Sequence, residues 1–165
     1  LCNLIARFWD VTGGSISIGG KNIKELSIHQ LSELVSFVTQ DNFLFNCSLK
    51  ENIRLGNPNA TDEEVYAAAK AACCDDFIAR LEKGYDTICT PELFSQGQWQ
   101  LLSIARAAAA NPRMLLLDEI TANLDAKTEA VVLDALERVA NHRTVISISH
   151  RTSARLGRVI QIEAN

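Results

Sequence analysis

The chain has 165 residues, enough for one domain with a real core, and its 47% hydrophobic and 22% charged residues are ordinary for a soluble globular protein. The net charge of −4 argues against a nucleic-acid surface, so no nucleic-acid partner is expected. The most apolar stretch, residues 101–120, is interrupted by arginines, an asparagine and a proline, which argues against a membrane span. The five cysteines include no C-x-x-C pair and indicate neither a disulfide framework nor a zinc site.

The first forty residues are predicted to alternate between short helices and strands. One helical face at the start is defined by Leu1, Leu4, Ile5 and Phe8. Two Gly-Gly pairs then bracket an alternating strand over residues 15–18. A short helix is expected over residues 28–34, and a strand over residues 35–39 ends at Gln40.

A long central segment, about residues 41–110, is mostly helical in pattern. The expected helices cover residues 49–55, 62 to about 73, 75–81, and 96 to about 110. Two capping boxes mark helix starts, Thr61 with Glu64 and Ser95 with Gln98. In each box the hydroxyl accepts a hydrogen bond from the amide three residues on, and the longer side chain reaches back to the cap amide.

The last third of the chain alternates between strands and a helix. A short apolar run, residues 114–117, predicts a parallel strand that is covered on both faces. A helix is expected over residues 126–140, with its apolar side facing inward, and a strand over residues 144–149 ends at His150. A final strand is expected over residues 159–162. Strand–helix–strand segments of this length imply a parallel pair with a right-handed crossover, so the fold class is α/β.

Two adjacent carboxylates, Asp118 and Glu119, follow the apolar strand directly. The carboxyl ends of parallel strands are where open α/β sheets bind ligands. One carboxylate there can hold Mg²⁺, and the next can orient a water molecule. The phosphate loop that normally accompanies such a site, G-x-x-x-x-G-K-[ST], does not occur: the one Gly-Lys pair, Gly20-Lys21, is followed by Asn22.

Five short motifs in order resemble those of the nucleotide-binding domain of ABC transporters. Residues 115–119 match the Walker B motif, residues 94–98 (Phe-Ser-Gln-Gly-Gln) match the ABC signature, and residues 123–125 match the D-loop. Gln40 matches the Q-loop and His150 the switch histidine. Each motif alone also has a purely structural interpretation, as a helix cap or as a polar strand end. Their order along nearly the whole chain favours the resemblance.

The resemblance implies a P-loop NTPase-like parallel sheet with an inserted ABC helical subdomain, about residues 41–110, and remnants of an antiparallel β region. Residues 1–165 would form a single, partial ABC ATPase domain that uses ATP and Mg²⁺. The roles implied are general base for Glu119, switch for His150, Mg²⁺ ligands for Asp118 and Gln40, and contacts to the ATP of a partner domain for Ser95, Gln96, Gly97, Gln98 and Asp125. Two residues depart from the usual signature, since Phe94 replaces a leucine and Gln96 replaces a glycine.

The function implied by the resemblance is ATP-driven export of a substrate that the sequence does not identify. The partners implied are a second nucleotide-binding domain, placed head to tail in a homo- or heterodimer, and a transmembrane domain, which place the chain at the cytoplasmic face of the cell membrane. Residues 43–53 resemble a segment that contacts the membrane domain in exporters. The phosphate loop is expected to lie before Leu1, so that this chain alone would be inactive. Two alternatives remain: a soluble ABC ATPase without a membrane domain, and an interaction module that does not hydrolyse ATP.

Overall fold

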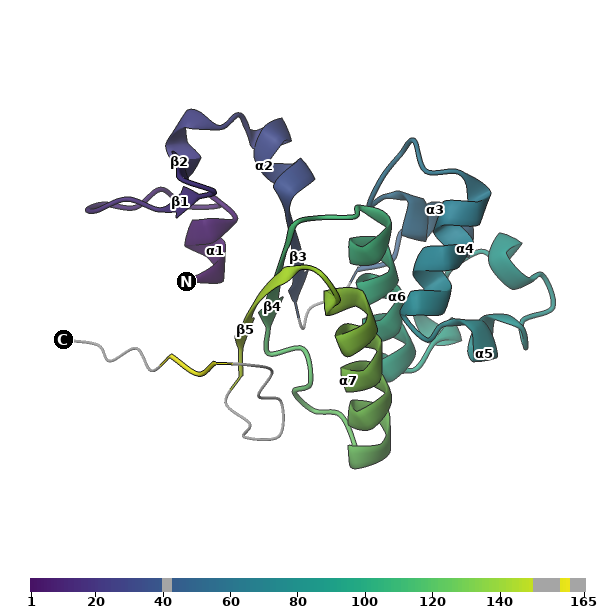
Figure 1. The fold of residues 1–165 in the computed structure, drawn as a ribbon. Helices are drawn as coiled ribbons and strands as arrows, with labels where there is room; N and C mark the ends of the chain where they lie inside the picture. The colour runs from purple at the N-terminus through teal and green to yellow at the C-terminus, as the bar shows by residue number, and fades with distance from the viewer. Residues whose placement is uncertain (40–42, 150–157, 161–165) are drawn as a thin grey trace.

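The computed structural model describes residues 1–39, 43–149 and 158–160. Its elements form layers on both sides of a central sheet (Figure 1). On one side lie helix α1 (Cys2–Ile5), a small hairpin and helix α2 (Ile28–Leu34). On the other side lie α6 (Gln96–Ala109) and α7 (Ala126–Ala140), with the remaining helices beyond them. This arrangement is the α/β architecture expected from the sequence.

The central sheet has the strand order β3 (Val35–Thr39), β4 (Met114–Asp118) and β5 (Thr144–Ile148). Both pairs are parallel, so the three strands end at the same edge. Helix α7 forms the crossover between β4 and β5, which confirms the expected parallel pair. Because β4 is the middle strand, the residues that follow it lie between the ends of the other two strands.

Strand β4 is buried on both faces because its side chains alternate between two hydrophobic clusters. Leu115 and Leu117 pack into the larger cluster, which the helices on the α6 and α7 side complete. Leu116 points to the other side and packs with residues of α1 and α2. Burial of all three leucines confirms the expectation of a strand covered on both faces, and each contributes roughly 1.5–3 kcal/mol.

The layer built from the first 34 residues contains short elements. Strands β1 (Ser17–Ile18) and β2 (Lys21–Asn22) form an antiparallel hairpin, followed by the 3₁₀ helix η1 (Ile23–Glu25). A capping box of Ser27 and Gln30, which the sequence reading missed, starts α2.

Helix α1 differs from the expectation because it ends after one turn. The predicted face included Leu1 and Phe8, but both side chains are exposed. Arg7 has a φ of 57°, and the amide of Phe8 donates to the carbonyl oxygen of Asn3 (2.9 Å). This pattern is a Schellman stop, which turns the chain out of the helix before Phe8. Cys2 and Ile5 are the buried residues of the helix.

The segment between β3 and β4 contains most of the helices, as predicted. In chain order they are α3 (Leu49–Arg54), α4 (Asp62–Ala71), α5 (Asp75–Ile78), η2 (Gly84–Asp86), η3 (Pro91–Leu93) and α6. The capping boxes predicted at Thr61 and Ser95 are both present. Helix α5 ends at Ile78, before the predicted Leu81, because i→i−3 bonds such as Leu81 N to Ile78 O (3.1 Å) tighten the chain there.

The prediction of a strand over residues 159–162 is wrong for residues 159 and 160, the two of this range that the structure describes. Val159 and Ile160 are exposed and belong to no strand. The alternating pattern signals strand propensity, but a strand forms only where a neighbour supplies its hydrogen bonds. Among the described residues, no helix is long and apolar enough to cross a membrane.

Candidate functional site

The carboxyl edge of the sheet brings Asp118 between the ends of two neighbouring strands. Asp118 is in register with Thr39 of β3 on one side and with Ile148 of β5 on the other. Gln40 follows Thr39 directly in the sequence and His150 lies two positions after Ile148, but both lie outside the described residues. The structure therefore places Asp118 and the strands that lead to Gln40 and His150, and it does not place those two side chains.

Glu119 occupies a sharp turn immediately after β4. Its φ of 50° lies in the left-handed region, which costs a residue with a side chain roughly 1–2 kcal/mol. Its amide donates to the carbonyl oxygen of Ile148 (3.0 Å), and its carbonyl accepts from the amide of Ala122 (2.9 Å). These two hydrogen bonds hold the backbone of the turn and so fix the position from which the Glu119 side chain projects. Backbone strain of this kind concentrates at functional sites.

Helix α1 approaches the same edge of the sheet. Burial, and next the charge of the Asp118 carboxylate, raise the pKa of the Cys2 thiol. The described residues contain no cluster of three His, Cys, Asp or Glu that could enclose a metal ion. A Mg²⁺ ion in a nucleotide site needs no such cluster, because one or two carboxylates, phosphate oxygens and water complete its shell. A hard carboxylate at a strand end is a donor that suits Mg²⁺.

The signature segment forms the start of α6, as its capping box predicted. The Ser95 hydroxyl oxygen accepts from the Gln98 amide (3.3 Å), and the Gln98 side-chain oxygen accepts from the Ser95 amide (2.9 Å). This leaves the amides of Gln96 and Gly97 as the two first-turn donors to which the box gives no acceptor. Amides at a helix start, together with the helix dipole, suit an anion such as phosphate. The side chain of Gln98 is already used within the cap.

Phe94, which stands where the usual signature has leucine, is a buried anchor. It is 7% exposed, and its ring lies 5.9 Å from that of Phe77 in an edge-on arrangement. The indole nitrogen of Trp99 donates to the carbonyl oxygen of Phe94 (3.2 Å), which ties the first turn of α6 to the residue before it. The substitution at this position is therefore accommodated in the core. Gln96 is exposed, so its side chain lies outside that packing.

The structure brings Gly97 and Asp125 together through Thr128. Asp125 caps α7, accepting from the amides of Lys127 (3.0 Å) and Thr128 (3.1 Å). The Thr128 hydroxyl also donates to Asp125 (2.6 Å). Hydrogen bonds from the Thr128 hydroxyl, first, and from its amide hold the pKa of Asp125 below its ordinary value of 3.8. A Cβ on Gly97 would lie 2.2 Å from the Thr128 Cγ2 atom, so the two helices meet closely here.

A second set of residues, which sequence reasoning missed, holds the segment after the Q-loop position. The buried Asn52 accepts from the Phe45 amide (2.8 Å) and donates to the Phe45 carbonyl oxygen (2.9 Å). Arg106 of α6 donates to the carbonyl oxygens of Asn52 and Phe43, each at 3.0 Å. Burial lowers the pKa of Arg106. No local pattern in the sequence signals contacts between residues so far apart along the chain.

These contacts present an apolar surface beside a hollow. Phe43 (64% exposed) and Phe45 (50%) form an edge-on aromatic pair at 4.9 Å. The adjacent cavity has a volume of about 300 Å³, and its lining includes Ser36, Ser103, Phe43 and Arg106. Exposed aromatic groups next to a hollow are typical of a protein interface.

Comparison with known proteins identifies relatives of this chain. The chain is 45% identical over 155 residues to an uncharacterized ABC transporter ATP-binding protein of Bacillus subtilis (strain 168), YknV, covering 93% of this chain and 26% of the relative. It is 49% identical over 151 residues to a second such protein of that organism, YfiC, covering 90% of this chain and 25% of the relative. This chain thus spans about a quarter of the length of these relatives.

A solved structure of a bacterial Atm1-family ABC exporter with ATP bound superposes with a TM-score of 0.82 at 43% identity, over 92% of this chain and 27% of that one. The sequence model of the family described as ABC transporter matches residues 1–122, the greater part of the chain. Asp118 and Glu119 lie within this matched region. The chain belongs to the ABC transporter family.

Proposed function

We propose that this chain is the ATP-hydrolysing domain of an ABC exporter. The observation that carries the proposal is the pair Asp118–Glu119 at the carboxyl end of the central parallel strand, with Glu119 held in a strained turn. Similarity to an exporter solved with ATP bound supports the assignment to export. The transported substrate would be selected by the transmembrane domain of such an exporter.

The proposed division of labour at the sheet edge follows from the chemistry of each side chain. Asp118 and Gln40 would hold Mg²⁺, which when bound polarises the phosphate oxygens. Glu119 would accept a proton from the attacking water, or orient that water. His150 would hold the water and the terminal phosphate in line.

The signature segment and Asp125 are proposed to act on a partner domain. The amides of Gln96 and Gly97, with the Ser95 hydroxyl, would donate to the ATP that a second nucleotide-binding domain holds, in a head-to-tail dimer. Gln98 would act through the cap that it forms with Ser95. Asp125 would contact the partner at the start of α7.

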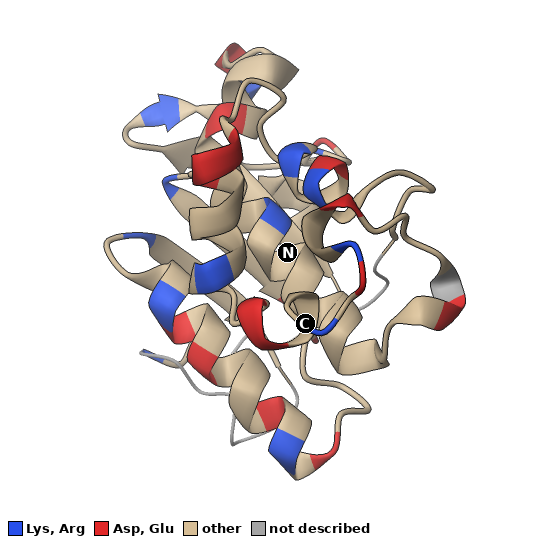
Figure 2. Ribbon diagram, turned by 90° about the vertical axis from the view of Figure 1, so that its right-hand side faces the viewer, with Lys and Arg blue, Asp and Glu red and all other residues tan. Residues whose placement is uncertain are grey.

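The apolar surface of Phe43 and Phe45 is the proposed contact with a transmembrane domain. Asn52 and Arg106 fix this surface onto α3 and α6, so a movement of α6 would be transmitted to it. We further propose that residues 41–110 form the helical subdomain of the family, and that the domain works at the cytoplasmic face of the membrane. Figure 2 shows acidic and basic residues interspersed along the helices that face the viewer. On α7, for example, Asp134 and Arg138 form an ion pair (2.8 Å). An interspersed surface favours protein partners over nucleic acid.

The test is the substitution Glu119→Gln in the native protein that carries this chain. The amide keeps the size of the side chain but cannot accept a proton, so we expect ATP hydrolysis to fall by about 100-fold or more. Binding of labelled ATP should stay intact. Glu137→Gln, an exposed carboxylate on α7, is the matched control and should leave both quantities unchanged.

Undiminished hydrolysis in the Glu119→Gln protein would remove Glu119 from the mechanism. ATP binding without hydrolysis in the unsubstituted protein would instead assign the chain to a non-hydrolysing module. Absence of ATP binding in the unsubstituted native protein would overturn the proposed function altogether.

A further inference from the structure

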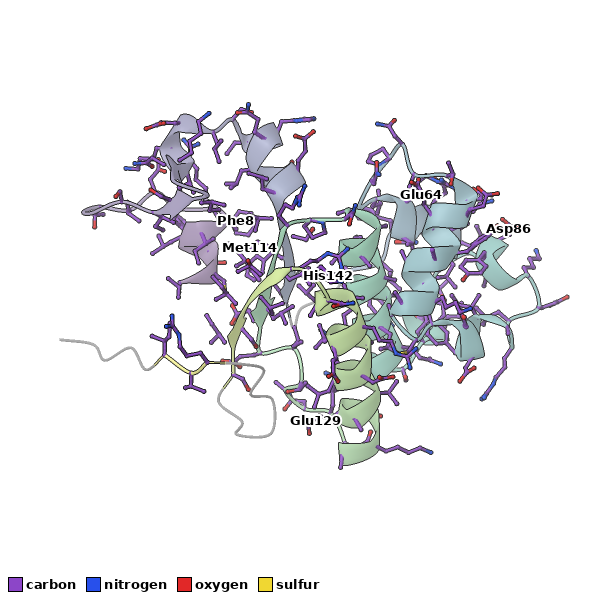
Figure 3. The ribbon with its side chains drawn as sticks, in the orientation of Figure 1. Phe8, Glu64, Asp86, Met114, Glu129 and His142 are labelled. Carbon is purple, nitrogen blue, oxygen red and sulfur yellow. The ribbon has the colours of Figure 1, made fainter. Side chains whose placement is uncertain are left out.

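Thr128 makes two contacts, in different directions, from the first turn of α7. Glu129, labelled in Figure 3, is its neighbour in that turn. The Thr128 hydroxyl donates to the Oδ2 atom of Asp125 at 2.6 Å. Its methyl carbon, Cγ2, occupies the space where a side chain on Gly97 would lie. One half-buried residue thus joins the end of the D-loop to the first turn of α6.

The contact with Gly97 explains why a glycine stands at this point of α6. A Cβ there would lie 2.2 Å from Thr128 Cγ2, which is far inside contact distance. Gly97 is buried, and α6 and α7 pack side by side in the larger cluster, so neither helix can move away without opening the core. The methyl group of Thr128 therefore determines how closely the start of α6 approaches α7.

We propose that Thr128 is a positioning residue that sets the first turn of α6, residues 95–98, relative to the carboxylate of Asp125. The inference rests on the proposed function, in which both groups act on the same partner domain. The hydroxyl orients the carboxylate, and the methyl places the amides of Gln96 and Gly97. An ordinary helix cap would need the hydroxyl or the backbone alone, and would not need the methyl.

The methyl half of the proposal is tested by a double-mutant cycle on unfolding. Gly97→Ala should lower the urea midpoint clearly, because its new methyl meets Thr128 Cγ2. Thr128→Ser removes Cγ2 and keeps the hydroxyl bond to Asp125, so its own loss should be small. The double variant should regain most of the urea midpoint that Gly97→Ala loses. The effects of the two substitutions would then be coupled and not additive.

Gly56→Ala combined with Thr128→Ser is the control for that cycle. A Cβ on Gly56 would meet the backbone oxygen of Arg106, which Thr128→Ser cannot relieve, so these two losses should add. Additive losses in the Gly97 pair as well would overturn the proposed contact.

The hydroxyl half is tested with Thr128→Val, which keeps the methyl group and removes the donor. Carbon-detected NMR titration of the Asp125 carboxyl should show its pKa rising toward the ordinary value of 3.8 in Thr128→Val and staying low in Thr128→Ser. An unchanged titration in Thr128→Val would show that the hydroxyl does not orient Asp125.

The kinetic test compares the same variants in the native protein. Thr128→Val should lower kcat on the order of tenfold and leave the KM for ATP unchanged, because the domain's own nucleotide contacts are untouched. A kcat equal to that of the unsubstituted protein in both Thr128→Val and Thr128→Ser would overturn the positioning role. If the proposed function fails, no variant will hydrolyse ATP. The unfolding cycle and the NMR titration would still show whether Thr128 contacts Gly97 and Asp125 as proposed.

Discussion

At the scale of single residues, two of the glycines that the structure describes lie where the backbone passes close to a neighbouring helix. Gly97 faces a side-chain methyl group, that of Thr128. Gly56, by contrast, faces backbone: a Cβ there would lie 2.0 Å from the Arg106 carbonyl oxygen and 3.1 Å from the Ala110 nitrogen. A second substitution can shorten a side chain but cannot remove a helix backbone, so the two positions should differ in how far a second substitution can rescue them.

Gly56→Ala is therefore expected to destabilise the fold by about 1–3 kcal/mol, the range for overpacking a rigid site. Gly13→Ala is the control, since a Cβ on Gly13 meets nothing within 4 Å, and it should change stability by less than about 0.5 kcal/mol. Urea unfolding followed by circular dichroism measures both. Equal stability of the two variants would mean that the chain after α3 can move away from α6.

At the scale of elements, the start of α6 has the same construction as the start of α2. Ser27 and Gln30 form a capping box at 3.1 and 3.0 Å, and Ser95 and Gln98 form one at 3.3 and 2.9 Å. Both boxes pair an exposed serine with glutamine. The protein thus contains a purely structural copy of the cap that the proposed function uses at the nucleotide.

Ser27→Ala and Ser95→Ala should each cost about 1 kcal/mol of stability, the usual value for a lost helix cap. ATP hydrolysis by the native protein should fall clearly only in Ser95→Ala, because only that hydroxyl faces the partner's nucleotide in the proposed dimer. Urea midpoints and steady-state hydrolysis rates on both variants give the comparison. If hydrolysis falls equally in both, Ser95 matters through stability alone.

Helices and strands with strong local patterns could be predicted from the sequence, and contacts between distant segments could not. Helix α7 begins and ends where its apolar period indicates, and its inward residues are the expected Val132, Ala135, Leu136 and Val139. Strand β4 and the cap at Ser95 carry equally local signals. The Gly97–Thr128 and Asn52–Arg106 contacts depend on how helices pack in space, which no periodicity reports.

At the scale of the whole molecule, the five cysteines lie in different parts of the fold and share one electrostatic property: a raised thiol pKa. Burial, as the first cause, raises the pKa of all five thiols above the ordinary value of 9.0, to about 11 for Cys89. A raised folded-state pKa means that the stability these neutral thiols contribute is fully present below the unfolded pKa. It is lost as the pH rises through 9 toward the folded values.

The urea midpoint, measured with reductant present, should accordingly be constant up to about pH 8 and fall between about pH 9 and about pH 11. The double variant Cys74→Ala/Cys89→Ala, which removes two of the buried thiols, should show a shallower fall. An alkaline profile of the same slope in both proteins would assign the loss to groups other than these thiols.

The alternation of β4 between two hydrophobic clusters has a consequence for cooperativity. Leu115 and Leu117 form part of the cluster on the helical side, and Leu116, between them on the same strand, forms part of the other. If β4 leaves one cluster, the other cluster loses the leucines of the same strand at the same time. We therefore expect the layers on the two sides of the sheet to unfold as a single cooperative unit, with no populated state in which only one has melted.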